Sequence, residues 1–527
     1  MFRKRSARSP FRNGYFRLLG GSKRLKTILG VAASHGFHNL VVRAKLGNFL
    51  FDKFLAKDME QFSTPERVRM AFEALGPTFV KLGQLLATRP DLIPTEYSEE
   101  FKKLHDQVSG VPFADIRDML TAHFGAPPSE VFSEFDEIPL AAASIAQVHL
   151  ARLKDGSQVV VKVQRPGIER VIREDLEILR GLADLFERYI PELRTYNPRG
   201  IVSEFARSME FETNFVVEAN NVRRFANNFA KEPNIKIPHV YSEFTGRRVL
   251  VLEALDGIPL SQKSALEQEG IQPEEVLRRG LRAYMKMVYS DGLFHGDLHA
   301  GNVLLLKNSQ IGLIDFGIVG RLNRKTQNAI ANMFLALAEE DYDRLAYLYV
   351  DLAPFTERVD VDEFAREIRD LIAPYFGLTM RNVNLGRLLL DSTAVASRHG
   401  LILPTELVMF FKSAVALEGM ARIILPDFDF LTYSLEFAKD LVQVNIEPKR
   451  LFSEASVFAR DLNSLISTLP RQVKQVLRRL NDPDFSLQVR SHDVEALRKT
   501  IERGSWLIFW GLIFAALTLG MILRYGR

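Results

Sequence analysis

Two short apolar runs, at residues 303–306 and 311–314, interrupt a long helical half of the chain and constrain its fold most. Upstream, "VHLARLKDGSQVVVKVQRPG" (residues 148–167) predicts two strands joined by a turn at Lys154-Asp155-Gly156-Ser157. Gly76-Pro77 is a helix-start signal, and helices are expected from about residue 168 to 189 and from about residue 197 to 229. After residue 272 the pattern is that of long amphipathic helices. Strands followed by helices, with a strand pair inside the helical part, predict a two-lobed α+β protein.

The composition is that of a globular protein. The 527 residues leave room for two to four domains, each with its own core. A hydrophobic fraction of 47%, a charged fraction of 25% and a net charge of +4 exclude a disordered or fibrous chain. The sequence has no cysteine, which excludes disulfides, thiolate metal sites and a cysteine nucleophile.

Both ends of the sequence suggest a membrane. Residues 1–50 hold eleven Lys or Arg and no Asp or Glu, interleaved with Phe and Leu. This pattern favours an anionic membrane surface. A mitochondrial transit peptide has the same composition, and nucleic-acid binding is a third reading, although no recognition module is visible.

Residues 505–523 contain no charge. As a helix they span roughly 28 Å, about the thickness of the hydrocarbon layer. Trp506 and Trp510 near one end and Arg524 and Arg527 at the other are typical interfacial anchors. The stretch predicts a transmembrane tail anchor, with a buried core helix as the alternative.

The two apolar runs are flanked by residues suited to phosphoryl transfer. "FHGDLHAGN" ends at Asn302, just before the first run, and "LIDFG" carries Asp315 after the second. If the runs pair as strands, both flanking loops face one cavity. Asn302 and Asp315 then offer oxygen ligands to Mg²⁺, and Asp297 would orient or deprotonate a hydroxyl or a water.

A lysine and a glutamate upstream complete the set. Lys162 lies on a strand in "VVVKV", where an inward-pointing cation needs an anion such as a nucleotide phosphate or a helix carboxylate. Glu218, in "FVVEANN", is the candidate carboxylate. His295 and His299, four residues apart, raise the alternative of zinc, but the residues between them are not those of a zinc-binding helix. We expect His295 to brace the loop.

The ordered motifs resemble the UbiB/ADCK family of atypical protein-kinase-like proteins over about residues 24–430. They are "KLGQ" (81–84), "PLAAASIAQVH" (139–149), "VVVKVQRPG" (159–167), "ETNFVVEANN" (212–221), "FHGDLHAGN", "LIDFGIVGRL" and "LPTELVMFFKSAVALEG" (403–419). The resemblance implies a kinase-like fold that binds ATP and Mg²⁺, with an alanine-rich nucleotide loop. Alanine restricts φ, so this loop should be less free than a glycine loop.

The resemblance also implies which residues serve the site. The cofactor-binding set would be Leu140, Ala141, Ala142, Ala143, Ser144, Ile145, Ala146, Gln147, Val148, Lys162, Glu218 and Glu253. The catalytic set would be Lys162, Asp297, Asn302 and Asp315, with Asn302 and Asp315 as the metal ligands. Leu140 and Val148 would bracket the adenine.

A helical segment with the motif Lys-x-Gly-Gln (the KxGQ element) covers the protein-substrate groove in the family. Here Lys81 and Gln84 stand three residues apart and would point together into the site, with Lys81 facing Glu212 as a regulatory contact. This sequence has Asn214 where the family has Asp. It also lacks an Ala-Pro-Glu triplet after Asp315, which argues against phosphorylation of proteins.

The expected domain order follows from these motifs. It is a basic amphipathic segment (1–54), the KxGQ element (55–134), a kinase-like N-lobe (135–255), a helical C-lobe with the catalytic and DFG loops (256–445), a helical linker (446–503) and the tail anchor (504–523).

The resemblance implies a membrane-tethered ATPase or kinase that supports ubiquinone biosynthesis or lipid-precursor handling. Its partners would be the membrane, isoprenoid quinone precursors or another lipid, and other ubiquinone biosynthesis proteins, but not nucleic acid. We expect the cytosolic face of a bacterial inner membrane, with the matrix face of the mitochondrial inner membrane as the alternative. A small-molecule kinase of the aminoglycoside- or choline-kinase type and a nucleotide-binding scaffold remain open.

Overall fold

The structure is a computed structural model, and its described residues all lie within Met1–Val444. It describes residues 23–37, 61–87, 89, 92–104, 110–190, 197–262, 272–353, 359–375, 384–425 and 428–436. The expected linker (446–503) and tail anchor (504–523) lie outside these ranges. None of the helices in these ranges combines the length and the hydrophobicity of a membrane span.

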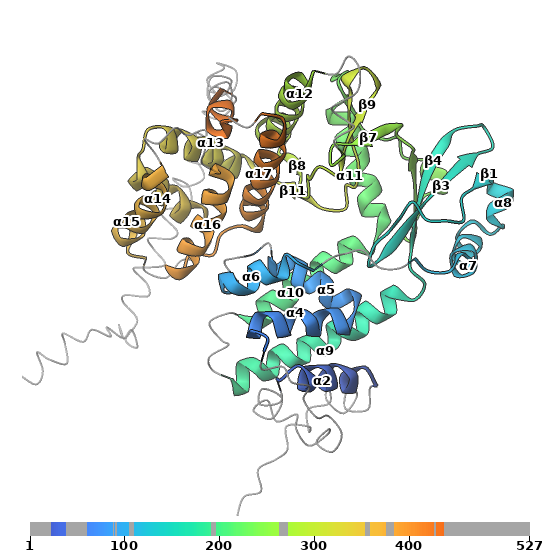
Figure 1. Cartoon of the computed structure of the whole chain (residues 1–527), viewed down its shortest axis with the longest axis horizontal. Helices are drawn as coiled ribbons and strands as arrows, with labels where there is room; N and C mark the ends of the chain where they lie inside the picture. Colours follow the sequence, from blue (N-terminus) through green and yellow to red (C-terminus); the bar gives the residue numbers. More distant parts are fainter. Residues whose placement is uncertain are drawn as a thin grey trace, which may run out of the picture. The chain divides into compact units, whose positions relative to one another are not determined.

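An antiparallel sheet forms the strand-rich part of the molecule (Figure 1). Its strands run in the order β1-β3-β4-β6, and β2 pairs with β3. Their bounds are β1 Phe132–Phe135, β2 Ala141–Ala142, β3 Ala146–Leu153, β4 Gln158–Gln164 and β6 Val249–Glu253. Alternate residues give the sheet two faces. Val159, Val161 and Val163 lie in one core with α7 (Phe113–Phe124), whereas Lys162 and Leu250 belong to the face covered by α11 (Phe215–Asn228).

The predicted turn between β3 and β4 is confirmed. Gly156 has a φ of +88°, which an L side chain rarely adopts, and the Asp155 carboxylate accepts a hydrogen bond from the Ser157 amide at 2.9 Å. Such a side-chain-to-backbone bond stabilises a tight turn. The turn therefore fixes the register of the two strands that position Lys162.

A helical group packs around a second apolar cluster. It contains α2 (Lys23–Ser34), α4 (Thr64–Leu75), α5 (Pro77–Ala87), α6 (Thr95–Phe101), α9 (Ile168–Tyr189) and α10 (Pro198–Glu212). A capping box of Ser63 and Glu66 starts α4, and Pro77 starts α5, as the Gly-Pro signal predicted. The short α8 (Pro128–Val131) leads instead from α7 into the sheet.

Part of the basic N-terminal segment is buried in this helical group. Leu25, Ile28 and Leu29 of α2 lie in the apolar cluster, and Arg24 forms an ion pair with buried Asp175 through Nε at 2.6 Å. Over residues 23–34 the apolar side of the segment therefore packs in the protein core and does not face a membrane surface. Residues 1–22 and 38–54 lie outside the described ranges.

The remaining elements form the helical part of the molecule. Strands β5 (Ile235–Lys236), β10 (Ile311–Leu313), β9 (Val303–Leu306) and β7 (Gly257–Pro259) make one sheet in that order, and β8 (Leu293–His295) pairs with β11 (Val319–Arg321). Around them lie α12 (Pro273–Met285), α13 (Arg324–Ala338), α14 (Tyr342–Leu352), α15 (Val361–Ile372), α16 (Leu385–Arg398) and α17 (Thr405–Ile424), with a π-helical turn at Lys286–Asp291 and 3₁₀ turns at Lys307–Ser309 and Ala373–Tyr375. The 3₁₀ turn at Ser242–Phe244 lies instead at the first sheet, where Phe244 packs against the core that α7 covers.

The single helix expected from about residue 197 to 229 is wrong, because α10 and α11 are separate helices. Thr213 ends α10 by donating its hydroxyl to the Met209 carbonyl at 2.7 Å. Asn214 then takes an extended conformation, and its side chain accepts a hydrogen bond from the Val216 amide. The side chain thus competes with the helical backbone and starts a new helix.

Candidate active site

Strand register places Lys162 at the centre of the candidate site. Lys162 pairs with Val148 on β3 and with Leu250 on β6, so its side chain leaves the face of the sheet covered by α11. There its Nζ lies 2.9 Å and 3.0 Å from the two carboxylate oxygens of Glu218 and 3.5 Å from Asp315 Oδ1. Three residues far apart in the sequence therefore meet at one cation.

The charges of these three groups are strongly coupled. Lys162 holds the pKa of Asp315 at about 2, against the opposing effect of burial. Burial lowers the pKa of Lys162, but the carboxylates of Asp315 and Glu218 outweigh it and raise that pKa above its usual value. Burial raises the pKa of Glu218, which is the least exposed of the three. Asp315 thus stays ionised at neutral pH, as a metal ligand must.

The segment after β10 turns Asp315 toward Lys162. Asp315 has a φ of +60°, in the left-handed region that Asp tolerates better than most residues. Its Oδ1 accepts a hydrogen bond from the Gly317 amide at 3.3 Å. Next to it, Phe316 is fully buried against the rings of Phe225 and His295. Because Phe316 is anchored in the core, the backbone of the adjacent Asp315 is fixed and its carboxylate is directed toward Lys162.

His295 braces the catalytic loop (residues 294–302), as expected. It is fully buried, and its Nδ1 accepts a hydrogen bond from the Asp297 amide at 3.2 Å. Its Nε2 therefore carries the proton and donates to the Ile314 carbonyl at 3.1 Å. Burial lowers the pKa of His295, in agreement with a neutral ring. This one ring links the catalytic loop to the segment that carries Asp315.

Asn302 and Asp297 lie together at the end of this loop. Asn302 Nδ2 donates to the Asp297 carbonyl at 3.1 Å, and the Ile314 amide donates to the Asn302 carbonyl. With Nδ2 fixed, Oδ1 is the side-chain atom that remains for a cation. One amide oxygen and the Asp315 carboxylate match the few protein ligands that Mg²⁺ takes beside substrate phosphates.

Lys412 was missed by the sequence analysis. It lies on α17, and its Nζ is 2.9 Å from Asp297 Oδ1. Burial raises the pKa of Asp297, but Lys412 outweighs it and the net direction is downward. The signal was present, because Lys412 is the sole lysine in the apolar helix "TELVMFFKSAVALEGMARII".

The alanine-rich segment folds back beside this site. Leu140, Ala141 and Ala142 pair with β3, and the Ala143 amide donates to the Ala146 carbonyl at 2.8 Å. Arg165 Nε donates to the Ala143 carbonyl, also at 2.8 Å. Leu140 is 62% exposed, Val148 shares the face of Lys162, and Ser144 and Ile145 are buried. The bend is thus held by backbone hydrogen bonds and by the Arg165 side chain.

Two members of the expected cofactor set point elsewhere. Gln147 lies on the opposite face of the sheet from Lys162, and its Oε1 accepts from the Val111 amide at 2.9 Å. Glu253 also leaves that opposite face, where its carboxylate pairs with Lys236 Nζ at 2.8 Å and accepts from the His239 amide. The structure therefore does not bring these two side chains to Lys162, because strand residues alternate between faces.

The KxGQ element contributes a second ion pair. Lys81 Nζ lies 3.3 Å from Glu212 Oε2, and the positive charge of Lys81 also helps to keep the pKa of Asp315 low. Gln84 is placed differently, since its Nε2 donates to the Leu104 carbonyl at 3.3 Å. Lys81 and Glu212 meet as expected, whereas Gln84 contacts its own helical group.

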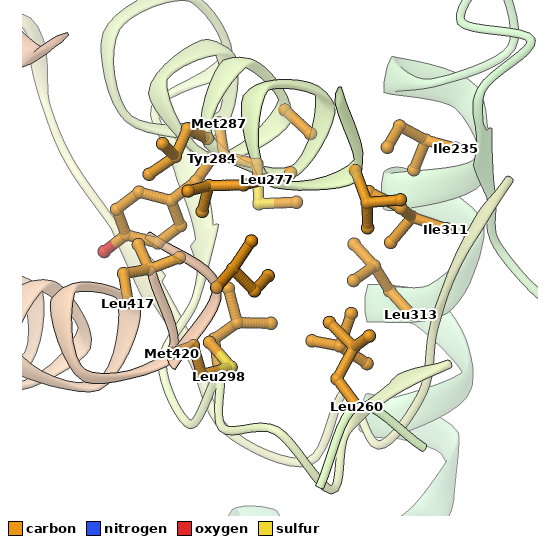
Figure 2. Close-up of a pocket in the computed structure, with 16 residues that line it drawn as sticks. Ile235, Leu260, Leu277, Tyr284, Met287, Leu298, Ile311, Leu313, Leu417 and Met420 are labelled. Carbon is orange, nitrogen blue, oxygen red and sulfur yellow. The ribbon is translucent and has the colours of Figure 1, made fainter. Parts of the chain in front are cut away.

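An apolar cavity of about 50 Å³ borders the catalytic loop (Figure 2). Leu298 and Val303, which immediately follow Asp297 and Asn302, line it from the loop. Leu417 of α17 lines it as well, as Figure 2 shows. The backbone next to Asp297 and Asn302 is thus supported by apolar side chains.

Known proteins resemble the chain over most of its length. Residues 103–349 match the ABC1 atypical kinase-like domain, and residues 368–429 match the UbiB helical domain. "Probable protein kinase UbiB" of Marinobacter nauticus is 35% identical over 395 residues, which cover 74% of this chain and 72% of that protein. The chain belongs to the UbiB family. The protein of the same name from Pseudomonas putida strain W619 is 31% identical over 511 residues, or 93% of this chain and 94% of that one.

This UbiB-family chain has a kinase-like fold of mixed helix and sheet. Among solved structures, the complex of Rv3197 with erythromycin from Mycobacterium tuberculosis aligns with a TM-score of 0.43 and 25% identity, and covers 66% of this chain and 92% of that one.

Proposed function

We propose that this chain is an atypical kinase-like ATPase that binds Mg-ATP and supports isoprenoid quinone biosynthesis at a membrane. The observation that carries the nucleotide site is the meeting of Lys162 Nζ with Glu218 at 2.9 Å and with Asp315 at 3.5 Å. A lysine held by a helix carboxylate next to a metal-binding Asp is the arrangement that phosphoryl-transfer enzymes use. The kinase-like domain match and the UbiB relatives support the same function.

Each residue then has a defined task. Lys162, fixed by Glu218, would bind the α- and β-phosphates. Asn302 and Asp315 would hold the magnesium ion, which when bound neutralises the developing charge on the phosphates. Asp297 would orient the acceptor hydroxyl or water.

Two features argue against a protein acceptor. Helix α13 begins at Arg324, soon after Asp315, and leaves little chain for a segment that docks a peptide. The KxGQ element reaches the site through the Lys81–Glu212 ion pair. Water or a small lipid-borne hydroxyl is the acceptor class that we propose.

We propose that the tail anchor at residues 504–523 tethers the enzyme, with the catalytic unit on the cytosolic side of a bacterial inner membrane. The uncharged stretch flanked by Trp and Arg supports the anchor. A role among other ubiquinone biosynthesis proteins belongs to this proposal as well.

The test is phosphate release from Mg-ATP by the full chain in detergent, with and without a phenolic lipid mimic. We expect release in the wild type and a loss of about 100-fold or more in Asp315→Asn, because that change removes a metal ligand. Asp343→Asn is the matched control. Asp343 also pairs with a cation, Arg369 at 3.4 Å, but lies at the surface.

Other outcomes would replace the proposal. Transfer of phosphate to a soluble alcohol or amine would identify a small-molecule kinase. A nucleotide-dependent rise in melting temperature without turnover would identify a scaffold. Equal turnover in Asp315→Asn and wild type would refute the assignment of the site.

A further inference from the structure

Helix α17 is docked firmly against the catalytic loop. Phe410, Phe411 and Ala414 are buried in the core. Ser413 donates its hydroxyl to the His295 carbonyl at 3.4 Å, and to the Met409 carbonyl of its own helix at 3.0 Å. The helix therefore has a fixed position relative to the loop that carries Asp297.

Lys412 reaches the Asp297 carboxylate from this helix. The backbone of Asp297 is held on both sides, by His295 Nδ1 at its amide and by Asn302 Nδ2 at its carbonyl. Within the described part of the chain, Lys412 Nζ is the donor that hydrogen-bonds the carboxylate itself, through Oδ1. The His299 imidazole lies farther away, with its Nε2 4.0 Å from Oδ2.

The exposure of the Lys412–Asp297 ion pair indicates whether the pair serves stability or orientation. The Lys412 and Asp297 side chains are 35% and 37% exposed, and ion pairs so accessible to water add little to stability. The orientation of the Asp297 carboxylate has a larger effect, because a misplacement of about 1 Å of a reacting group can lower the rate on the order of 100-fold. The pair therefore matters for geometry more than for folding.

We propose that Lys412 is a positioning residue for phosphoryl transfer. By holding Oδ1, it fixes the rotamer of Asp297 and leaves Oδ2 to receive the hydrogen of the acceptor hydroxyl or water. This inference rests on the proposed function and extends its site to a helix beyond the catalytic and DFG loops.

The experiment is a double-mutant cycle on the full chain in detergent, with kcat and KM for Mg-ATP measured from phosphate release. We expect Lys412→Met to lower kcat by about 10- to 100-fold and to leave KM within about 2-fold, because the nucleotide contacts lie elsewhere. Lys412→Arg should recover part of kcat. Lys412→Met combined with Asp297→Asn should be no slower than Asp297→Asn alone, within about 2-fold.

Lys102→Met is the matched control. Lys102 pairs with Glu99 at 2.7 Å and is 41% exposed, so the change removes a similar ion pair far along the chain from the catalytic loop. It should leave kcat unchanged. If Lys412→Met melts at a lower temperature than the assay requires, Lys412→Gln takes its place in the cycle.

Two results would overturn the positioning role. One is wild-type kcat in both Lys412→Met and Lys412→Gln. The other is a double variant slower than Asp297→Asn by the full factor of the lysine change, since independent effects multiply. In either case the wild type still releases phosphate, and the proposed function stands. Absence of release from the wild type would instead refute the proposed function, and the inference with it.

Discussion

Lys162 and Glu218 form an ion pair with little access to water, since 22% and 6% of their side chains are exposed. Removal of one partner leaves an uncompensated buried charge. We expect Lys162→Met to lower the free energy of unfolding by about 3 kcal/mol in urea titrations at pH 7. Lys162→Met with Glu218→Leu should recover most of this loss. A single variant as stable as the wild type would contradict the buried pair.

His149 predicts a pH dependence of stability. Its ring is fully buried, and its Nδ1 and Nε2 are bonded to the Asp136 carbonyl and to Gln147 Nε2. Burial lowers its pKa in the folded state below the usual 6.5. The unfolded chain therefore binds more protons below pH 6.5, and stability falls as pH falls from there toward the folded-state pKa.

The slope of the free energy of unfolding against pH measures this effect directly. One extra proton in the unfolded state contributes at most about 1.4 kcal/mol per pH unit. Urea unfolding between pH 7 and pH 5 should show a shallower decline in His149→Gln than in the wild type. Equal slopes for the two proteins would show that His149 titrates alike in both states.

Single residues were predictable where their chemistry is unusual. An isolated lysine in "VVVKV" and the Asp-x4-Asn spacing pointed to Lys162, Asp297 and Asn302 because charged groups in apolar frames need partners. The family resemblance placed Gln147 and Glu253 in the cofactor-binding set. Register alone could reveal that both face away from Lys162.

At the scale of elements, Asn214 separates α10 from α11. Its side chain accepts a hydrogen bond from the Val216 amide at 3.2 Å and starts the helix that carries Glu218 one turn later. Since Asn and Asp cap helices about equally well, the departure from the family pattern preserves this structural task.

Substitution of Asn214 tests the cap. We expect Asn214→Ala to lower the free energy of unfolding by about 1 kcal/mol, and Asn214→Asp to change it by less than about 0.5 kcal/mol. The measurement is urea unfolding followed by circular dichroism. An Asn214→Ala variant with the wild-type free energy of unfolding would indicate that packing alone positions α11.

Periodicity located most elements but not this break. The helix at residues 168–189 was predicted at its observed bounds, because its apolar face is continuous and Pro166 and Gly167 precede it. The buried apolar residues of α10 and α11 recur every three or four positions within each helix, and only the six-residue step from Met209 to Phe215 departs from this spacing. The break depends on side-chain bonds to the backbone, which periodicity does not record.

At the scale of the whole molecule, the order of the helices along the chain does not indicate which elements each amphipathic helix packs against. Helix α7 packs on the sheet, whereas α9 and α10, which follow the strands, join the helices of the N-terminal part. An apolar stripe predicts that a helix is covered and leaves open what covers it. The assignment of each helix to one of the apolar cores therefore could not be predicted from a single sequence.

The proposed tail anchor makes a prediction for the complete chain. Removal of residues 504–527 deletes the uncharged stretch and its arginines. We expect the full chain to sediment with membranes after a carbonate wash, and the shortened chain to remain in the supernatant. Sedimentation of the shortened chain to the same extent would place the membrane contact elsewhere.

One magnesium-nucleotide site is proposed to contain Lys162, Glu218, Asn302 and Asp315. Its most direct test is titration calorimetry of ATP into the full chain, with Mg²⁺ or with a chelator, in the wild type and in Asp315→Asn. If these four residues form that site, ATP binds the wild type with Mg²⁺, and either the chelator or Asp315→Asn weakens binding at least about 10-fold. ATP affinity that is undetectable in the wild type, or that is unchanged by both treatments, would contradict it.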